Sequence, residues 1–252
     1  MRDLRMIIPI LVIAGLVIAA GFPVPPALAG PYDDCVALAA SDPARAEVEA
    51  QRWVQDGGGT PARHCRALAL LAQGAERRAA ELMVAITSDD RTLPDEVRSE
   101  MLIEAGEIYL GLGDLELGHN AASHALMLAR APRAALTLSA RLKAARGDWQ
   151  GAVNDLDGAL SRGEPDAGLL VLRASARLRL GERVAARADL MWATELAPDL
   201  ASIWLERGAL EALSDDRDAA RAAWLKAIEM DRDGVVGEAA RLRLQRMEAG
   251  GN

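Results

Sequence analysis

Two consecutive stretches of 34 residues decide how this chain folds: AGLLVLRASARLRLGERVAARADLMWATELAPDL (Ala167–Leu200) and ASIWLERGALEALSDDRDAARAAWLKAIEMDRDG (Ala201–Gly234). Each has a small residue within a first helical segment, then a turn residue, then a small-large-small pattern in a second helical segment. The corresponding positions are Ala174, Gly181, Ala186, Leu190 and Ala193, and Gly208, Asp215, Ala220, Trp224 and Ala227. We therefore expect each stretch to form two helices joined by a turn.

The same frame continues toward the N-terminus. One period earlier it reads Ala140, Gly147, Ala152, Leu156 and Ala159, and two periods earlier Gly106, Gly113, Gly118, Ala122 and Ala125. A 34-residue period of helix–turn–helix units, with Trp204 and Trp224 as aromatic positions and Pro198 closing a unit, resembles the tetratricopeptide repeat (TPR). The chain departs from the family pattern where Asp215 replaces a turn glycine and where charged residues replace leucine or tyrosine, namely at Arg173, Arg177, Arg207 and Glu211.

The resemblance implies an all-α fold, a right-handed α-solenoid of stacked antiparallel helix hairpins. Small residues such as Gly208 let the two helices of a hairpin approach closely, and neighbouring hairpins must stack because one hairpin cannot bury its apolar face alone. Five units are expected, at about 60–93, 99–132, 133–166, 167–200 and 201–234. Before them we expect a degenerate hairpin at 30–59, and after them a capping helix and tail at 235–252. A polar insertion, Thr87 to Arg91, is expected to be a surface loop, and Thr60 to be an N-terminal helix cap.

The first 29 residues have the layout of an export signal. Arg2 and Arg5 precede the uncharged apolar run Met6 to Gly21, and Ala27-Leu28-Ala29 supplies the small residues that a signal peptidase reads. We therefore expect cleavage between Ala29 and Gly30 and a periplasmic or secreted protein. An uncleaved N-terminal anchor is the alternative, and it would be the protein's sole attachment to a membrane.

Two cysteines, Cys35 and Cys65, begin similar sequences 30 residues apart. In an exported chain this number of cysteines favours one disulfide, which would fasten the end hairpin. Free buried thiols or a redox pair are the other interpretations, although no C-x-x-C motif is present.

Composition and motifs argue against several functions. The formal net charge of −8 disfavours nucleic acid as a partner. No nucleotide-binding or nucleophile motif occurs, and the spacing of His64, His119 and His124 does not suit a metal site. We expect Glu104 to lie on an exposed face. The sequence thus predicts no enzyme, cofactor or metal, although an unrecognised envelope enzyme remains an alternative.

The family resemblance places a binding groove on the first helices of the units. Carried onto this chain, the groove residues are Ile103, Glu107, Thr137, Arg141, Val171, Ser175, Arg179, Leu205 and Ala209, with His64 at the corresponding place nearer the N-terminus. The lysines and asparagines of the family's carboxylate clamp are absent, and the mostly apolar set suits an amphipathic helix or an extended apolar segment. The sequence therefore predicts a protein-interaction scaffold of the bacterial cell envelope that binds another envelope protein. A self-assembling module, in which one copy takes a terminal segment of another, is the alternative.

Overall fold

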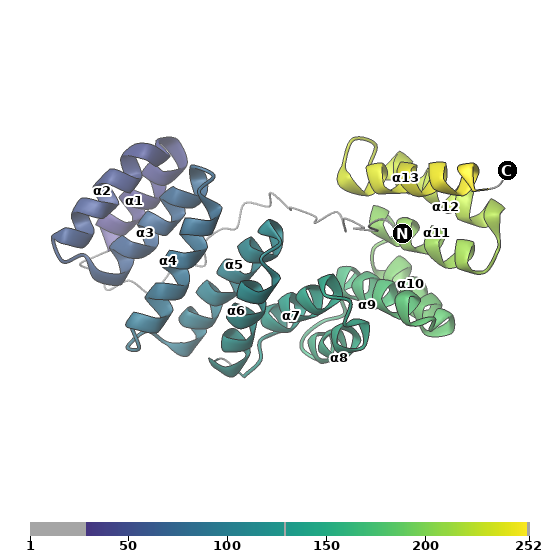
Figure 1. The fold of residues 1–252 in the computed structure, drawn as a ribbon, viewed down its shortest axis with the longest axis horizontal. Coiled ribbons are helices and arrows are strands. Elements are labelled where there is room, and N and C mark those ends of the chain that lie inside the picture. Colours follow the sequence, from purple (N-terminus) through teal and green to yellow (C-terminus); the bar gives the residue numbers. More distant parts are fainter. Residues whose placement is uncertain (1–28, 129, 251–252) are drawn as a thin grey trace, which may run out of the picture. The chain divides into compact units, whose positions relative to one another are not determined.

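The computed structural model describes residues 29–128 and 130–250, and within them the chain forms helices and no strands (Figure 1). This confirms the predicted fold class, an all-α solenoid of helix hairpins. The helices are α1 (Ala29–Ser41), α2 (Pro43–Gln55), α3 (Gly59–Ala72), α4 (Glu76–Asp89), α5 (Asp95–Leu112), α6 (Leu115–Leu128), α7 (Arg133–Ala145), α8 (Trp149–Leu160), α9 (Ala167–Leu180), α10 (Arg183–Leu196), α11 (Ala201–Leu213), α12 (Arg217–Met230) and α13 (Val235–Ala249).

The described residues form two compact units that divide within α7, between Leu138 and Ser139. In the N-terminal unit α1 packs on both α2 and α3, and each later helix packs on the one before it as far as α6. In the C-terminal unit the first helices also contact one another, α9 with α11 and α11 with α13. Hairpins in each unit are therefore stacked on their neighbours, as a repeat fold requires.

Helix ends follow local sequence signals. Asp42, Asp148, Asp166 and Asp216 each accept a hydrogen bond from a backbone N–H in the first turn of the helix that follows. At the turn position of the repeat, Gly181 has φ +80° and Asp215 has φ +62°. Asp215 thus adopts the same left-handed conformation as the glycine it replaces, which aspartate tolerates better than most residues.

Alanine, glycine and one tryptophan bring α11 and α12 together in the C-terminal unit. Gly208 lies against the indole of Trp224, where a Cβ atom would overlap the ring. The ring nitrogen of Trp224 donates a hydrogen bond to the carbonyl oxygen of Leu205 at 3.1 Å. The buried apolar residues of this cluster are Leu205, Ala220, Trp224, Ala227, Val236 and Ala240.

One expectation for the N-terminal unit holds only in part and one is wrong: Asp90 and Arg91 do lie in a loop between α4 and α5, but the loop begins later than predicted, and Thr60 is not a helix cap. Helix α4 continues to Asp89, so Thr87 is helical and buried, with its hydroxyl donating to the Val84 carbonyl at 2.8 Å. The insertion is partly taken up by α5, which has 18 residues and begins at Asp95. Thr60 lies inside α3 and does not cap it, because its hydroxyl instead donates to Asp90 at 2.6 Å.

Candidate functional site

A hollow of about 530 Å³ lies between the first helices of two successive pairs in the N-terminal unit. Helix α5 contributes Ile103 and Glu100, and the beginning of α7 contributes Ala134. The remaining residues around it come from the first turns of α5 and from the end of α6 and its connection to α7: Asp95, Glu96, Ser99, Leu128, Arg130 and Pro132. The hollow therefore lies beside the N-terminal half of α5, the end of α6 and the first turn of α7.

The hollow is lined by half-buried apolar residues, which we call its floor, and by exposed charged residues, which we call its rim. Ile103, Leu128 and Pro132 supply apolar surface, whereas the rim includes three carboxylates and one guanidinium. The Asp95 carboxylate forms an ion pair with the Arg98 guanidinium at 3.2 Å, and this pair lies within the first turn of α5. Such a surface can take an apolar side chain while its rim favours a positively charged neighbour.

The structure brings none of the other predicted groove residues to this hollow. Glu107 and Thr137 are half-buried, and the Thr137 hydroxyl donates to the Arg133 carbonyl one turn earlier at 2.9 Å. Among the predicted groove residues, Ile103 alone lines this hollow.

In the C-terminal unit, two predicted groove residues prove to be core residues. Val171 and Leu205 are each only 6% exposed and pack in separate apolar clusters. Their assignment to an open groove was wrong, because Val171 packs among residues of α9, α10 and α11, and Leu205 packs among residues of α12 and α13. Arg179 is exposed and lies 5.3 Å from the ring centroid of Trp149, whereas the half-buried residues of the predicted set in this unit are Arg141, Ser175 and Ala209.

His64 is likewise buried rather than part of a groove. It is 4% exposed, and its Nδ1 lies 2.7 Å from the hydroxyl oxygen of Tyr32 on α1. Burial lowers the pKa of His64 to about 4, so the ring is neutral at physiological pH. Burial, followed by the charges of Glu104 and Asp33, raises the pKa of Tyr32.

Glu104 on α5 is half-buried, which corrects the expectation of an exposed face. Burial raises its pKa above the ordinary range, because the charged carboxylate loses hydration. Glu104 also acts electrostatically on Tyr32, so three first helices, α1, α3 and α5, contribute titratable groups to this interior region. Periodicity places such residues on a helix face but does not show how deeply a neighbouring hairpin covers them.

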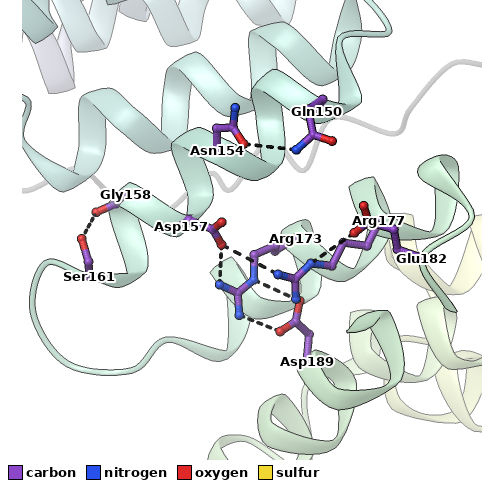
Figure 2. Close-up of polar contacts among 9 residues, drawn as sticks. All are labelled: Gln150, Asn154, Asp157, Gly158, Ser161, Arg173, Arg177, Glu182 and Asp189. Atoms are coloured by element: carbon purple, nitrogen blue, oxygen red, sulfur yellow. Dashed lines mark hydrogen bonds and ion pairs between the residues drawn. The ribbon is translucent and has the colours of Figure 1, made fainter. Parts of the chain in front are cut away.

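A buried ionic network joins α8, α9 and α10 in the C-terminal unit (Figure 2). The Asp189 carboxylate accepts hydrogen bonds from Arg173, at 2.6 and 3.0 Å, and from Arg177 at 2.7 Å. Arg173 also reaches Asp157 on α8 at 2.7 Å. The side chain of Asp189 is 4% exposed, whereas that of Asp157 is 50% exposed.

Sequence reasoning missed this network, because Arg173 and Arg177 were treated only as departures from the family pattern. A signal was nevertheless present. One period earlier, Lys143 and Asp155 occupy the positions of Arg177 and Asp189, and they form the same cross-hairpin ion pair at 2.7 Å. The charged residues that depart from the family pattern therefore have a structural role, since an ion pair between the two helices of a hairpin occurs at the same repeat position in both hairpins.

The Cys35–Cys65 disulfide is present in the structure and joins α1 to α3, with Cα atoms 6.2 Å apart. Both cysteines are buried in one cluster with Tyr32, Ala50 and the partly buried Trp53. The disulfide thus fastens the hairpin at the end of the N-terminal unit. The expected cleavage position, between Ala29 and Gly30, lies at the beginning of α1. The rest of the predicted signal segment lies outside the described part of the chain.

Within residues 29–128 and 130–250, no group of histidine, cysteine, aspartate or glutamate side chains is arranged to hold a metal ion. In the same residues we find no helix with the length and apolar character needed to span a bilayer. Acidic residues near the turns cap helices: Asp231 accepts from the backbone of Val236 at 2.9 Å, and Asp216 from that of Ala219 at 3.0 Å.

Stacked helix hairpins are the architecture of α-solenoids, the class that includes TPR proteins, and comparison with solved structures confirms the resemblance at the level of fold. The chain is similar to YrrB, described as a TPR protein with an unusual peptide-binding site, at 16% identity over 76% of this chain and 96% of that chain, with a TM-score of 0.56. It is similar to a TPR protein from Parabacteroides merdae, at 17% identity over 84% of this chain and 83% of that one, with a TM-score of 0.60. It also resembles the C-terminal part of a TPR protein from Cytophaga hutchinsonii, at 15% identity over 79% and 78% of the two chains, with a TM-score of 0.63. No protein-family model and no curated protein matches the chain.

Proposed function

We propose that this protein is a non-catalytic scaffold that holds a peptide or helix of another protein against the first helices of its repeats. The observation that carries the proposal is the hollow between α5 and α7, where Ile103 and Leu128 form an apolar floor within an acidic rim. A small apolar site with polar edges is the composition that recurs where proteins hold peptide segments. YrrB, which has a similar fold, is described as having a peptide-binding site, and this supports a peptide as the kind of ligand.

The proposed partner is an envelope protein, since the chain is proposed to be exported. Support comes from the signal-like layout between Arg2 and Ala29 and from the Cys35–Cys65 disulfide, a bond typical of oxidising compartments. Fractionation of the native cells followed by mass spectrometry of the protein's N-terminus tests this. A chain beginning at Gly30 in the envelope fraction is the expected result, and an intact N-terminus in the cytoplasm would contradict export.

Site-specific crosslinking in cells tests the binding surface. A photoreactive residue at Ile103 should capture a partner, whereas one at Met127, which is 74% exposed on α6 and outside the hollow, should not. Capture from Met127 but not from Ile103 would show that the surface is wrongly assigned. Val171 is unsuitable for such a test, because it lies in the core and its replacement would disturb folding.

Binding measurements with the captured partner supply the second half of the test. Ile103→Arg places a charge on the apolar floor and should weaken binding at least about tenfold, as expected for the loss of an interface anchor. Met127→Arg is the matched control, because it makes the same change in charge on an exposed site outside the hollow, and it should leave affinity unchanged. Equal effects of the two variants would refute the assignment.

A further inference from the structure

The hollow beside α5 is bordered by two carboxylates that have no cationic partner among the described residues. Glu96 and Glu100 both line it, and both are exposed. They lie four residues apart on α5, so their side chains are neighbours on one side of the helix. Within residues 29–128 and 130–250 neither side chain forms an ion pair or a hydrogen bond, whereas Asp95 is paired with Arg98. The two carboxylates are therefore accessible to a cation from another molecule.

Neither helix formation nor the repeat pattern explains Glu100. The helix dipole favours acidic residues in the first turn of a helix, and this accounts for Asp95 and Glu96. Glu100 lies in the second turn, where it is beyond that effect, and like charges four residues apart weaken a helix. In the three units that follow, small uncharged residues occupy its position: Ala134, Gly168 and Ser202. The stacking of hairpins thus does not require a carboxylate at this position.

The charges around the hollow favour a cationic ligand. The lining residues include a cation, Arg130, which belongs to the connection between α6 and α7. Arg130 forms no ion pair with Glu96 or Glu100 in the described part of the chain. Because Asp95 is balanced by Arg98, the rim retains two negative charges against the one positive charge of Arg130. An acidic peptide would meet net repulsion there, whereas a basic one would meet net attraction.

The spacing of residues on α5 constrains the ligand further. Ile103 on the floor follows Glu100 by three residues, so their Cβ atoms are roughly 5–6 Å apart. A ligand that covers Ile103 with an apolar side chain and reaches Glu100 with a cation must carry the two groups at a similar separation. In an extended peptide, side chains two residues apart point to the same side and lie about 6–7 Å apart. In a helical peptide, side chains three or four residues apart meet this requirement.

We propose that the hollow binds a segment of the partner protein in which a lysine or arginine accompanies a large apolar residue. The two are separated by two positions in an extended segment and by three or four in a helical one. The apolar side chain covers Ile103, and the cation lies beside Glu96 and Glu100. This inference rests on the proposed function, because it names the ligand of the same hollow, and it adds a requirement for positive charge.

Selection from a random peptide display library, with the full chain as bait, tests the inference. A parallel selection uses Ile103→Ser, which removes the apolar side chain from the floor without adding a charge. Peptides that bind the unchanged protein but not this variant are assigned to the hollow. Compared with the unselected library, these peptides should be enriched in lysine or arginine at the stated spacing from leucine, isoleucine, methionine or phenylalanine.

Titration of the enriched peptides measures the effect of charge. Glu96→Gln combined with Glu100→Gln should weaken binding about fivefold at low ionic strength. The effect should diminish in about 1 M salt, which screens exposed charges. Arg130→Gln should strengthen binding, because it removes a charge that repels the ligand. Glu81→Gln is the matched control: Glu81 is exposed on α4 and does not line the hollow, so affinity should be unchanged.

The outcomes separate this inference from the proposed function. Peptides that depend on Ile103 but lack a basic residue would overturn the charge requirement and leave the proposed function standing. Equal affinity for the unchanged protein and the double glutamine variant would have the same consequence. A library that yields no peptide dependent on Ile103 would contradict the proposed function, and this inference with it. Circular dichroism should show unchanged helix content in the glutamine variants, since the altered side chains are exposed.

Discussion

Asp189 shows how one buried residue organises its surroundings. Its carboxylate is enclosed between α9 and α10 and accepts hydrogen bonds from Arg173 and Arg177, both of which are largely covered. The net benefit of such a buried pair over apolar packing is small, but losing one member leaves the other charge poorly solvated. The network therefore makes stability depend strongly on the carboxylate.

Replacing Asp189 should consequently be costly. Asp189→Ala is expected to lower the free energy of unfolding by about 2–4 kcal/mol. Asp157→Ala removes a half-exposed member of the same network and should cost less than about 1 kcal/mol. Urea denaturation followed by tryptophan fluorescence measures both values. Similar losses for the two variants would mean that burial of Asp189 does not control the network.

His64 predicts a pH dependence in the acid range. Its pKa is about 4 in the folded protein and 6.5 in the unfolded chain, so the unfolded state takes up a proton first as pH falls. Neutral His64 therefore makes its full contribution to the free energy of unfolding above about pH 6.5. As the pH falls from there to about 4, this contribution is lost, and the free energy of unfolding decreases by at most about 3 kcal/mol. Glu104 acts in the opposite direction, since its raised pKa lets the folded state bind a proton earlier.

The measurement is the free energy of unfolding between neutral pH and pH 4. His64→Gln keeps a hydrogen-bonding side chain but cannot titrate, so its stability should fall less over this window than that of the unchanged protein. Glu104→Gln should give a steeper fall, because the opposing carboxyl group is gone. Identical profiles for the three proteins would disprove the assignment to His64.

Within a helix pair, the close approach of α11 and α12 depends on the absence of a side chain at Gly208. A Cβ there would overlap the ring of Trp224, which is buried and fixed by its hydrogen bond to Leu205. Gly208→Ala should therefore destabilise the protein by about 1–3 kcal/mol despite the higher helix propensity of alanine. Gly111→Ala is the control: no atom lies within 4 Å of its Cβ position, so thermal denaturation should show a gain in stability of up to about 1 kcal/mol.

The Cys35–Cys65 disulfide also constrains how helices pack, since it links α1 to α3 across 30 residues of sequence. A loop of that length stabilises by about 3–4 kcal/mol in the chain-entropy model. Cys35→Ser together with Cys65→Ser should raise amide hydrogen exchange in α1 to α3 and leave α11 and α12 unchanged. Uniform acceleration over all helices would contradict a local role. Thiol titration of the denatured, unreduced protein should find no free thiol.

For the molecule as a whole, the 34-residue period was sufficient to predict the class of fold. Small residues such as Gly208 and turn residues such as Asp215 specify where two helices meet and where the chain reverses, and these are local properties of sequence. The depth of burial was less predictable, because it depends on what the next hairpin covers. Val171, Leu205 and His64 were assigned to a groove for this reason, although their neighbours enclose them.

The candidate site was predicted only in part for a related physical reason. Ile103 was identified from the repeat register, but Asp95 and Glu96 precede the predicted unit 99–132, so the register assigned these two acidic residues no part in the groove. The Asp189 network could have been predicted only by comparing charged residues between successive repeats. The position of a residue within a repeat thus predicts which helix it belongs to better than it predicts whether its side chain is exposed.

Deletion of one whole repeat tests most directly whether a 34-residue helix pair is the structural unit of this protein. Removing residues 167–200 joins Asp166 to Ala201 and preserves the register, so the shortened chain should melt cooperatively with one helix pair fewer by circular dichroism. Removing residues 167–183, half a period, deletes α9 and places second-helix residues after Asp166, so the chain should lose its cooperative transition. Loss of folding in both shortened chains to the same extent would contradict the repeat as the unit of structure.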